Sequence, residues 1–209
     1  MLKILIADDH EIVRRGLKQI LLEGFSFAYI EEAGDGPTLV EKALNGVWDI
    51  IVSDLAMPGG GGLEALKQIK QKSSTIPVLI LSIYPEDQYA LRVMKAGAAG
   101  YLNKDAAPEE LVTAVNRILG GRRYITEGIA EKLVQKLDEQ DDVPAHELLS
   151  DREWDVFRYL AGGKSVSEIS KTLLLKSTTV STYRTRILAK MNMKTNADLI
   201  QYALENKLL

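Results

Sequence analysis

Short apolar runs alternate with helical patterns through the first 120 residues of the 209-residue chain. Two runs, at 50–52 and 78–81, are continuously apolar, which is typical of parallel strands covered on both faces. The pattern predicts an α/β domain with a doubly wound, five-stranded parallel sheet. Its strands are expected at Lys3–Ala7, Tyr29–Ala33, Ile50–Asp54, Val78–Ser82 and Gly100–Asn103. The first helix between them is expected to share one apolar face among Ile12, Gly16, Ile20 and Leu21.

From Leu148 onward the pattern is helical throughout. Ser150 and Glu153 have the spacing of a capping box, in which each side chain bonds the backbone N–H of the other residue. The helix that follows ends at Gly162, and a second is expected over 166–173. A third is expected over 178–191 with Ser177 as its N-cap, and a fourth from about 196. These signals predict a small all-α domain.

A linker is expected between the two domains. Thr126 is predicted to cap a short helix whose apolar residues recur every four positions from Ile129. Residues 138–144 are too acidic and too broken in pattern to pack, and we interpret them as flexible. The predicted boundaries are 1–120 for the first domain, 121–147 for the linker and 148–209 for the second domain.

Composition excludes several classes of protein. The chain has no cysteine, which rules out a disulfide scaffold, a thiolate zinc site and a cysteine nucleophile. No apolar run approaches the roughly 18 residues that span a bilayer, so no membrane association is expected. The first acidic residue, Asp8, comes too early for the apolar core of a signal peptide. The expected compartment is therefore the cytoplasm.

Charge is distributed unevenly along the chain. Residues 1–120 hold 12 Lys/Arg and 16 Asp/Glu, a net charge of −4, whereas residues 148–209 hold 10 and 6, a net charge of +4. An acidic first domain and a basic second domain suggest two separate tasks, and the basic domain points to nucleic acid as a partner.

Acidic side chains gather at the carboxyl ends of the predicted strands. Asp8 and Asp9 follow the first strand directly, and Asp54 ends the third. Clustered anions repel one another, and a hard divalent cation such as Mg²⁺ relieves the repulsion. Ser82 ends the fourth strand and Lys104 follows the fifth, which adds a hydroxyl and a cation. The set predicts a phosphoryl-transfer site in which metal and lysine neutralise phosphoryl oxygens and one carboxylate is the nucleophile.

Each of these residues has a simpler interpretation when it is taken alone. An aspartate after a strand is usually a helix N-cap, and a lone lysine is usually solvated. His10, beside the acidic pair, is interpreted as a polar residue at a helix start and not as a ligand. The presence of all five residues at successive strand ends favours the phosphoryl site.

Residues 1–120 resemble the receiver domain of two-component response regulators. The resemblance rests on the acidic pair, on an aspartate followed by LAMPG, and on a hydroxyl, an aromatic ring and a lysine further along the chain. These residues are Asp8, Asp9, Asp54, Ser82, Tyr101 and Lys104. The resemblance implies a flavodoxin-like fold with strand order 2-1-3-4-5.

The resemblance also implies how the acidic residues divide the work. Asp54 would accept a phosphoryl group from a sensor histidine kinase. Asp9, Asp54 and the backbone carbonyl of Ala56 would bind Mg²⁺, and Asp8 would assist through water.

Three further roles follow from the same resemblance, together with two departures from the family pattern. Ser82 and Lys104 would hold the phosphoryl oxygens, and Tyr101 would change rotamer with the state of the site. Position 82 is more often threonine, but serine keeps the hydroxyl. Asp105 stands where many receivers have a proline after the lysine, so the usual cis-proline is absent.

The second domain carries a basic helix. Residues 169–197 contain six Lys/Arg and no acid. A charge run alone usually marks a solvated face. Here the run lies mainly in the second of two short helices joined by a tight turn, and the expected exposed face is small and polar. Such a face suits the major groove of DNA, where cations neutralise phosphates and side chains near the helix start read base edges.

Residues 148–209 resemble the LuxR-type helix-turn-helix of NarL/FixJ-type regulators. The resemblance rests on LSDRE at 149–153, SEIS at 167–170, TVSTY at 179–183 and KMN at 190–192. It implies contacts with double-stranded DNA, with Ser181, Thr182 and Thr185 as candidate base readers. The other candidate contacts are Lys176, Ser177, Thr179, Tyr183, Arg184 and Lys190.

The last predicted helix has two interpretations. Family members dimerise through this helix, and a stripe of apolar residues on it fits that use. The same stripe fits the core of a monomer equally well, and the sequence leaves both interpretations open. The stripe consists of Leu199, Ile200, Ala203 and Leu204.

The sequence as a whole predicts a transcription regulator and not an enzyme. Phosphorylation at Asp54 would switch the first domain and either free or dimerise the second, and a homodimer would then bind paired half-sites. Two alternatives stay open: a Mg²⁺-dependent phosphohydrolase with an accessory helical domain, and a DNA binder that does not depend on phosphorylation. The absence of an obvious general acid other than Asp8 argues against the phosphohydrolase.

Overall fold

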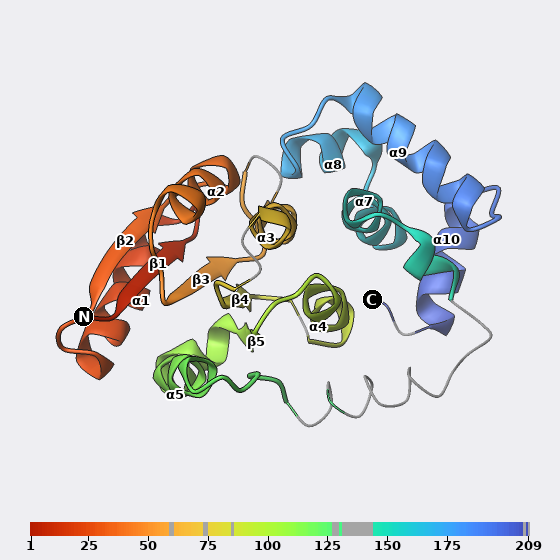
Figure 1. Ribbon diagram of the computed structural model, residues 1–209. Helices are drawn as coiled ribbons and strands as arrows, with labels where there is room; N and C mark the ends of the chain where they lie inside the picture. The colour runs from red at the N-terminus through yellow and green to blue at the C-terminus, as the bar shows by residue number, and fades with distance from the viewer. Residues whose placement is uncertain are drawn as a thin grey trace. The chain divides into compact units, whose positions relative to one another are not determined.

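The computed structural model describes residues 1–58, 61–72, 75–84, 86–126, 130, 144–206 and 208. The chain forms two compact units, Met1–Asp138 and Glu139–Leu209, which are labelled by element in Figure 1. Each unit has a buried apolar core of its own. Among the described residues, no helix is both long enough and apolar enough to cross a membrane.

A five-stranded parallel sheet forms the centre of the first unit. Its order is β2-β1-β3-β4-β5, and every neighbouring pair is parallel. The strands are β1 (Lys3–Ala7), β2 (Tyr29–Ala33), β3 (Ile50–Asp54), β4 (Val78–Ser82) and β5 (Gly100–Asn103). These bounds and this order confirm the prediction. Every residue of β3 and β4 is buried, which is why their sequences are nearly continuous apolar runs.

Helices cover both faces of this sheet. α1 and α5 pack against each other and bury apolar residues against the strand residues that point to their side. Neighbouring residues along each strand point to opposite faces of the sheet. On the face away from α1 and α5, α2 packs against α3 (Figure 1). The helices are α1 (Glu11–Gly24), α2 (Gly36–Asn45), α3 (Gly61–Lys72), α4 (Glu86–Lys95) and α5 (Ala107–Leu119), with the short helix η1 (Lys104–Ala106) before α5.

The apolar face of α1 differs from the predicted one. Leu17 and Leu21 are its buried residues, and Val13 and Ile20 pack partly against the same core. Ile12 is 80 % exposed, so its predicted place on the buried face was wrong. Two four-residue periodicities overlap in this helix, and contact with α5 and the sheet selects the one that contains Leu17 and Leu21.

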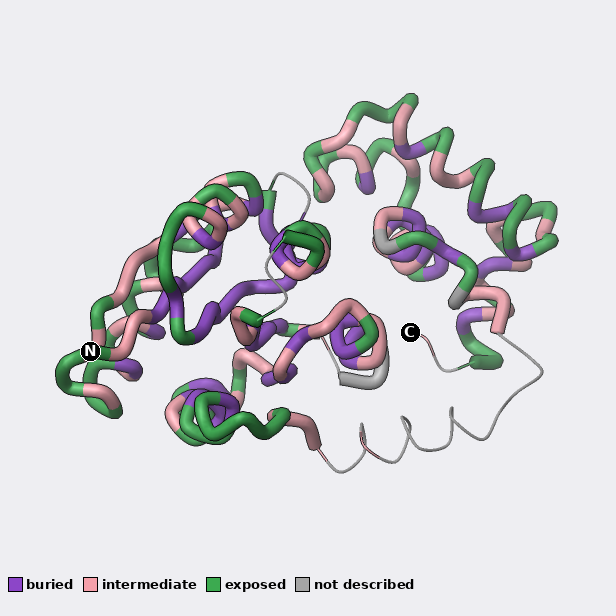
Figure 2. Tube along the Cα trace, in the orientation of Figure 1, coloured by how far each residue is buried: buried purple, intermediate pink, exposed green. Residues whose placement is uncertain are grey.

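The second unit is a small bundle of helices. α7 packs against α9 and α10, and α8 packs against α9. Figure 2 shows buried residues along α7, whereas much of α9 is exposed. The predicted capping box between Ser150 and Glu153 is present. The elements are η2 (Ala145–Leu148), α7 (Asp151–Ala161), α8 (Val166–Thr172), α9 (Ser177–Lys190) and α10 (Asn196–Glu205).

α9 begins one residue earlier than predicted. Lys176 occupies the N-cap position and makes no side-chain capping bond, so the prediction that Ser177 is the N-cap was wrong. Ser177 is the first helical residue, and its Oγ lies 3.3 Å from Oγ of Ser170 across the turn from α8. The turn passes through Leu174, whose φ of 53° is in the left-handed region. The Ser177 hydroxyl is therefore engaged by Ser170 of α8 and does not cap α9.

Most of the predicted linker lies outside the described residues. This applies to the expected helix through Ile129, Leu133 and Leu137 and to the acidic stretch that begins at Asp138. At the start of the linker, the backbone N–H of Ala130 donates to the carbonyl oxygen of Thr126 at 3.1 Å.

Candidate functional site

The carboxyl ends of β1, β3 and β5 bring three charged side chains together. Asp8 follows β1 and is fully buried, Asp54 ends β3 with 5 % exposed, and Lys104 follows β5. Nζ of Lys104 lies 2.6 Å from Oδ2 of Asp8 and 3.0 Å from Oδ2 of Asp54. The ammonium group therefore bridges two buried carboxylates that come from different strands.

Burial and charge act in opposite directions at this site. Burial raises the pKa of Asp54 to about 6, although the neighbouring Lys104 acts to lower it. Burial alone would lower the pKa of Lys104, but Asp54 and Asp8 outweigh it and hold that pKa above its usual value. A buried carboxyl group whose charged form is this poorly stabilised gains from a second cation, which fits a divalent metal ion.

Asp9 and His10 lie beside the buried pair. Oδ1 of Asp9 lies 2.8 Å from Nδ1 of His10, and the backbone N–H of His10 donates to Oδ1 of Asp8 at 2.8 Å. One ligand atom from each of Asp8, Asp9 and His10 falls within 4.8 Å of the others. His10 is the N-cap residue of α1, as the sequence predicted for its position, but its side chain does not cap the helix.

The segment after β3 approaches Asp54 closely. The backbone N–H of Ala56 donates to the Asp54 carboxylate, which acts to lower its pKa. The first turn of α3 lies against the same strand end, since the N–H of Gly62 donates to the carbonyl oxygen of Leu55 at 2.8 Å. A Cβ atom at position 62 would lie 2.0 Å from the carbonyl oxygen of Asp54, so only glycine fits here.

Ser82 and Tyr101 hold the same residue, Tyr84. Oγ of Ser82 accepts the backbone N–H of Tyr84 at 3.0 Å. The phenol of Tyr101, on β5, is fully buried and donates to the carbonyl oxygen of Tyr84 at 2.8 Å. Tyr84 therefore connects the hydroxyl at the end of β4 to the aromatic side chain on β5.

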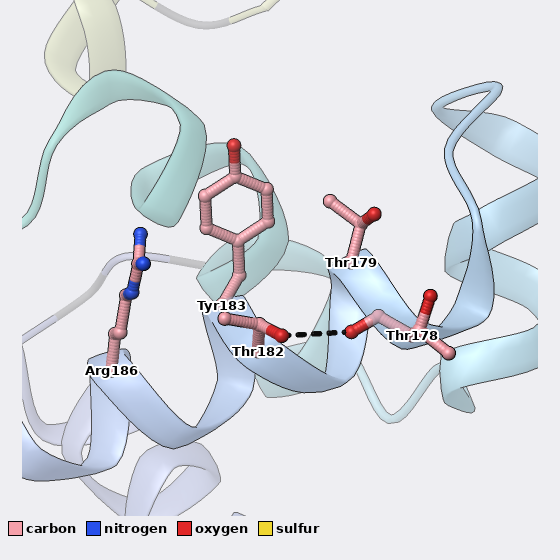
Figure 3. A pocket seen from close by; sticks show the side chains of 5 residues that line it. All are labelled: Thr178, Thr179, Thr182, Tyr183 and Arg186. Atoms are coloured by element: carbon pink, nitrogen blue, oxygen red, sulfur yellow. Dashed lines mark hydrogen bonds between the residues drawn. The ribbon is translucent and has the colours of Figure 1, made fainter.

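The exposed face of α9 carries a small hollow. Its volume is about 320 Å³. Figure 3 shows that all the residues lining it project from α9, with Tyr183 and Arg186 side by side. The lining consists of Thr178, Thr179, Thr182, Tyr183 and Arg186. Oγ1 of Thr182 donates to the carbonyl oxygen of Thr178 at 3.0 Å, so this donor is used within the helix, while the methyl group and the oxygen lone pairs can meet a ligand.

The other candidate DNA contacts divide into two groups. Most are exposed or half-buried on α9 or at its start: Lys176, Ser177, Thr179, Ser181, Tyr183 and Thr185. Two basic residues have partners inside the domain. Nε of Arg184 donates to Oδ1 of Asn196 at 2.7 Å, and Nζ of Lys190 lies 2.6 Å from Oε2 of the buried Glu153.

Comparison with known proteins decides the family. Residues 4–116 match the model of the response regulator receiver domain, and residues 147–203 match that of the luxR family of bacterial regulatory proteins. The chain is 34 % identical to the response regulator UvrY of Escherichia coli (strain K12), over 100 % of this chain and 96 % of UvrY. It belongs to the NarL/FixJ-type response regulators.

Two further proteins resemble this response regulator over nearly its whole length. The response regulator GacA of Pseudomonas aeruginosa is 35 % identical over 99 % of this chain and 97 % of GacA. The solved structure of RcsB from Salmonella enterica serovar Typhimurium is 25 % identical, with a TM-score of 0.61 over 97 % of this chain and 98 % of that chain. In that structure RcsB is bound to promoter rprA in the presence of the phosphomimetic BeF₃⁻.

Two residues of this response regulator were not among the predicted site contacts. Tyr84 joins Ser82 to Tyr101 through backbone atoms, which leave no signal in the sequence. Arg186 lines the hollow on α9, and here a signal existed. Thr178, Thr182 and Arg186 are spaced by four residues, which places them on one side of a helix.

Proposed function

We propose that this response regulator binds DNA under the control of a phosphoryl group that Asp54 accepts from a sensor histidine kinase. The observation that carries the proposal is the buried arrangement of Asp54, Asp8 and Lys104 at one edge of the sheet. Nucleophile, charge-neutralising lysine and acidic metal ligand are then within reach of one phosphoryl group. The proposed domain limits are 1–120 for the receiver, 121–147 for the linker and 148–209 for the DNA-binding domain.

In the proposed reaction, a carboxylate oxygen of Asp54 forms a bond to phosphorus while the bond from phosphorus to the kinase's histidine nitrogen breaks. Lys104, 3.0 Å from that carboxylate, exchanges a carboxylate oxygen for a phosphoryl oxygen. Asp9, Asp54 and the carbonyl oxygen of Ala56 would hold Mg²⁺, and Asp8 would assist through water. When bound, the metal neutralises charge on the phosphoryl oxygens.

The proposed switch begins at Ser82. Its hydroxyl is a donor for a phosphoryl oxygen, and its Oγ already accepts the N–H of Tyr84. Since the carbonyl oxygen of Tyr84 accepts the phenol of Tyr101, fixing Ser82 also favours the buried rotamer of Tyr101.

The proposed output is recognition of double-stranded DNA by α9. Small hydroxyl side chains and Arg186 surround the hollow on its exposed face, and RcsB, a relative, is bound to a promoter in its solved structure. Ser181, Thr182 and Thr185 are proposed to meet base edges in the major groove, with a homodimer on paired half-sites. Lys176, Thr179, Tyr183 and Arg184 are proposed to lie near phosphates.

Replacing the phosphoacceptor tests the proposal. Asp54→Asn keeps the shape of the side chain but removes the nucleophile, so a small phosphodonor should neither phosphorylate the variant nor tighten its binding to operator DNA. Intact mass and fluorescence anisotropy measure the two effects. Asp105→Asn, an exposed aspartate in η1, is the matched control and should behave as the wild type. Equal tightening in wild type and Asp54→Asn would exclude Asp54 as the control point.

The same experiment separates the two alternatives. Repeated turnover of phosphate esters by the wild type would favour the phosphohydrolase. Tight, sequence-specific binding that is indifferent to the phosphodonor would favour the phosphorylation-independent DNA binder.

A further inference from the structure

The chain returns to the sheet after α5. Gly121, with φ of 76°, reverses its direction, and the N–H of Arg122 donates to the carbonyl oxygen of Arg117 at 3.1 Å. Residues 122–126, which we call the strap, follow α5 in Figure 1 and form a parallel bridge to β5 between Tyr124 and Gly100. β5 is the last strand in the sheet order, so the strap lies along its outer edge.

Tyr124 holds the strap in place through four contacts. Its backbone N–H donates to the carbonyl oxygen of Ala99 at 2.9 Å, and its carbonyl oxygen accepts the N–H of Tyr101 at 3.1 Å. Its phenol donates to Glu110 on α5, and its ring packs partly against the core between the sheet, α1 and α5. The strap is thus a one-residue extension of the parallel sheet.

Gly100 makes this close approach possible. A Cβ atom at position 100 would lie 2.8 Å from the carbonyl oxygen of Tyr124 and 2.9 Å from its Cβ. Any side chain at this position would therefore push the strap away from β5. The glycine at the start of β5 is explained by the close approach of the strap and of Leu79 Cδ1, which would lie 3.0 Å from the same Cβ atom, and not by strand formation, which glycine weakens.

Tyr101 is held from both sides. Its side chain donates to Tyr84, which Ser82 also holds, and its backbone N–H donates to Tyr124. Hydrogen bonds therefore connect Ser82 at the end of β4 to Tyr84, and Tyr84 to the phenol of Tyr101. The backbone N–H of Tyr101 then continues the connection to Tyr124, among the first residues of the predicted linker. Packed side chains have discrete arrangements, so this connection is a physical route by which a change at one end could alter the stability of the other.

We propose that the strap is the element through which the receiver controls the linker, and that Tyr124 and Gly100 are positioning residues for this coupling. The proposal rests on the proposed function of Asp54. A phosphoryl group bound by Ser82 stabilises Tyr84 and the buried Tyr101, and through the N–H of Tyr101 it stabilises the strap.

Hydrogen exchange tests whether a phosphoryl group at the acidic site stabilises the strap. Beryllofluoride, used as a phosphoryl mimic with Mg²⁺, should slow exchange of the Tyr101 and Tyr124 amides by at least about fivefold, a modest coupling between sites. The amide of Asn116, inside α5, reports general stabilisation and should change less. Unchanged exchange at Tyr124 in beryllofluoride-loaded wild type would overturn the proposal.

The variant Gly100→Ala, made in the full chain, tests whether phosphorylation needs the strap in order to tighten DNA binding. The added methyl group should displace the strap, so the Tyr124 amide should exchange fast in both states. Phosphorylation by a small phosphodonor should stay within about twofold of wild type, because no residue of the acidic site is touched. The tightening of DNA binding on phosphorylation should fall by about tenfold. Gly120→Ala is the matched control, since a Cβ atom there meets nothing nearer than 3.4 Å.

Two further variants keep the outcome decisive. If Gly100→Ala fails to fold, Tyr124→Ala tests the same coupling from the other side of the contact. Tyr124→Phe keeps the ring and both backbone bonds, and it should restore most of the coupling. The proposal would be overturned if the strap is displaced in Gly100→Ala or Tyr124→Ala while phosphorylation still tightens DNA binding as much as in wild type. If wild-type DNA affinity does not respond to phosphorylation at all, the proposed function fails, and the exchange of Tyr124 with beryllofluoride still decides the role of the strap.

Discussion

Lys190 illustrates how a partner distant in sequence determines what one side chain does. It ends α9 and belongs to the basic run that predicts phosphate contacts, yet its ammonium lies 2.6 Å from Oε2 of Glu153 on α7. Glu153 is buried and also accepts from the N–H and Oγ of Ser150. The ion pair therefore joins the end of α9 to the start of α7, and a phosphate contact for Lys190 stays a prediction.

Lys190→Ala should destabilise the second unit. It leaves the Glu153 carboxylate buried without its cation, which costs about 1–3 kcal/mol, toward the lower end because 42 % of the Lys190 side chain is exposed. Hydrogen exchange of the α7 amides under urea measures the loss. Lys194→Ala, an exposed lysine outside this contact, should cost less than about 0.5 kcal/mol. Unchanged stability with weaker binding to all DNA sequences would instead assign Lys190 to phosphate.

The same ion pair predicts a pH dependence. Burial alone would raise the pKa of Glu153, but hydrogen bonds from Lys190 and Ser150 outweigh it and hold the pKa below its usual 4.5. A carboxyl group with a lowered folded-state pKa stabilises the fold fully above its unfolded pKa, and the stabilisation disappears as pH falls through the folded value. Glu153→Gln should therefore be less stable than wild type at pH 7, with the difference shrinking as the pH falls below 4.5 and through the lowered folded-state pKa. A difference that persists in acid would contradict the assignment.

Among whole elements, the strands were predicted better than the helices, and this includes the half-buried edge strand β2. β3 and β4 were predicted to the residue because central parallel strands bury both faces and tolerate only apolar runs between polar ends. α1 has only one buried side, and its sequence offered two overlapping stripes, so Ile12 was misplaced. The charged residues of the site were predictable because parallel strands end at one edge, whereas Tyr84 and the Lys190–Glu153 pair depend on tertiary contacts that no local pattern encodes.

On α9, residues that contact phosphates and residues that contact base edges should respond differently to substitution. Arg186 lines the exposed hollow, so Arg186→Ala should weaken binding to all sequences and reduce the slope of log K against log salt by about 0.9, one phosphate contact. Thr182→Ala removes no charge and should leave the slope unchanged. It should relax preference at one base position in each half-site, by at most about 1–3 kcal/mol. Salt titrations on specific and scrambled DNA measure both.

A changed base preference without a changed slope in Arg186→Ala would show that Arg186 reads a guanine edge instead. A changed slope in Thr182→Ala would show that the proposed orientation of α9 in the groove is wrong.

At the scale of the whole molecule, phosphorylation in one unit has to alter binding by the other. The sequence left two routes open: release of a DNA-binding face, or dimerisation. α10 does not decide between them: Leu199 and Ala203 belong to the core of the second unit, while Leu204 is 64 % exposed. The predicted apolar stripe is thus divided, with part of it in the core and part available to a second copy.

A comparison of one half-site with two distinguishes these routes. If phosphorylation dimerises the chain, a phosphodonor should tighten binding to DNA with two half-sites by about 100-fold or more, through effective concentration, and leave binding to one half-site within about twofold. If phosphorylation exposes α9 instead, both DNAs should be bound more tightly by the same factor. Leu204→Glu places a charge on the exposed part of the stripe, so it should abolish the two-half-site gain and spare single half-site affinity. Equal tightening on both DNAs, unaffected by Leu204→Glu, would exclude dimerisation through α10 as the switch.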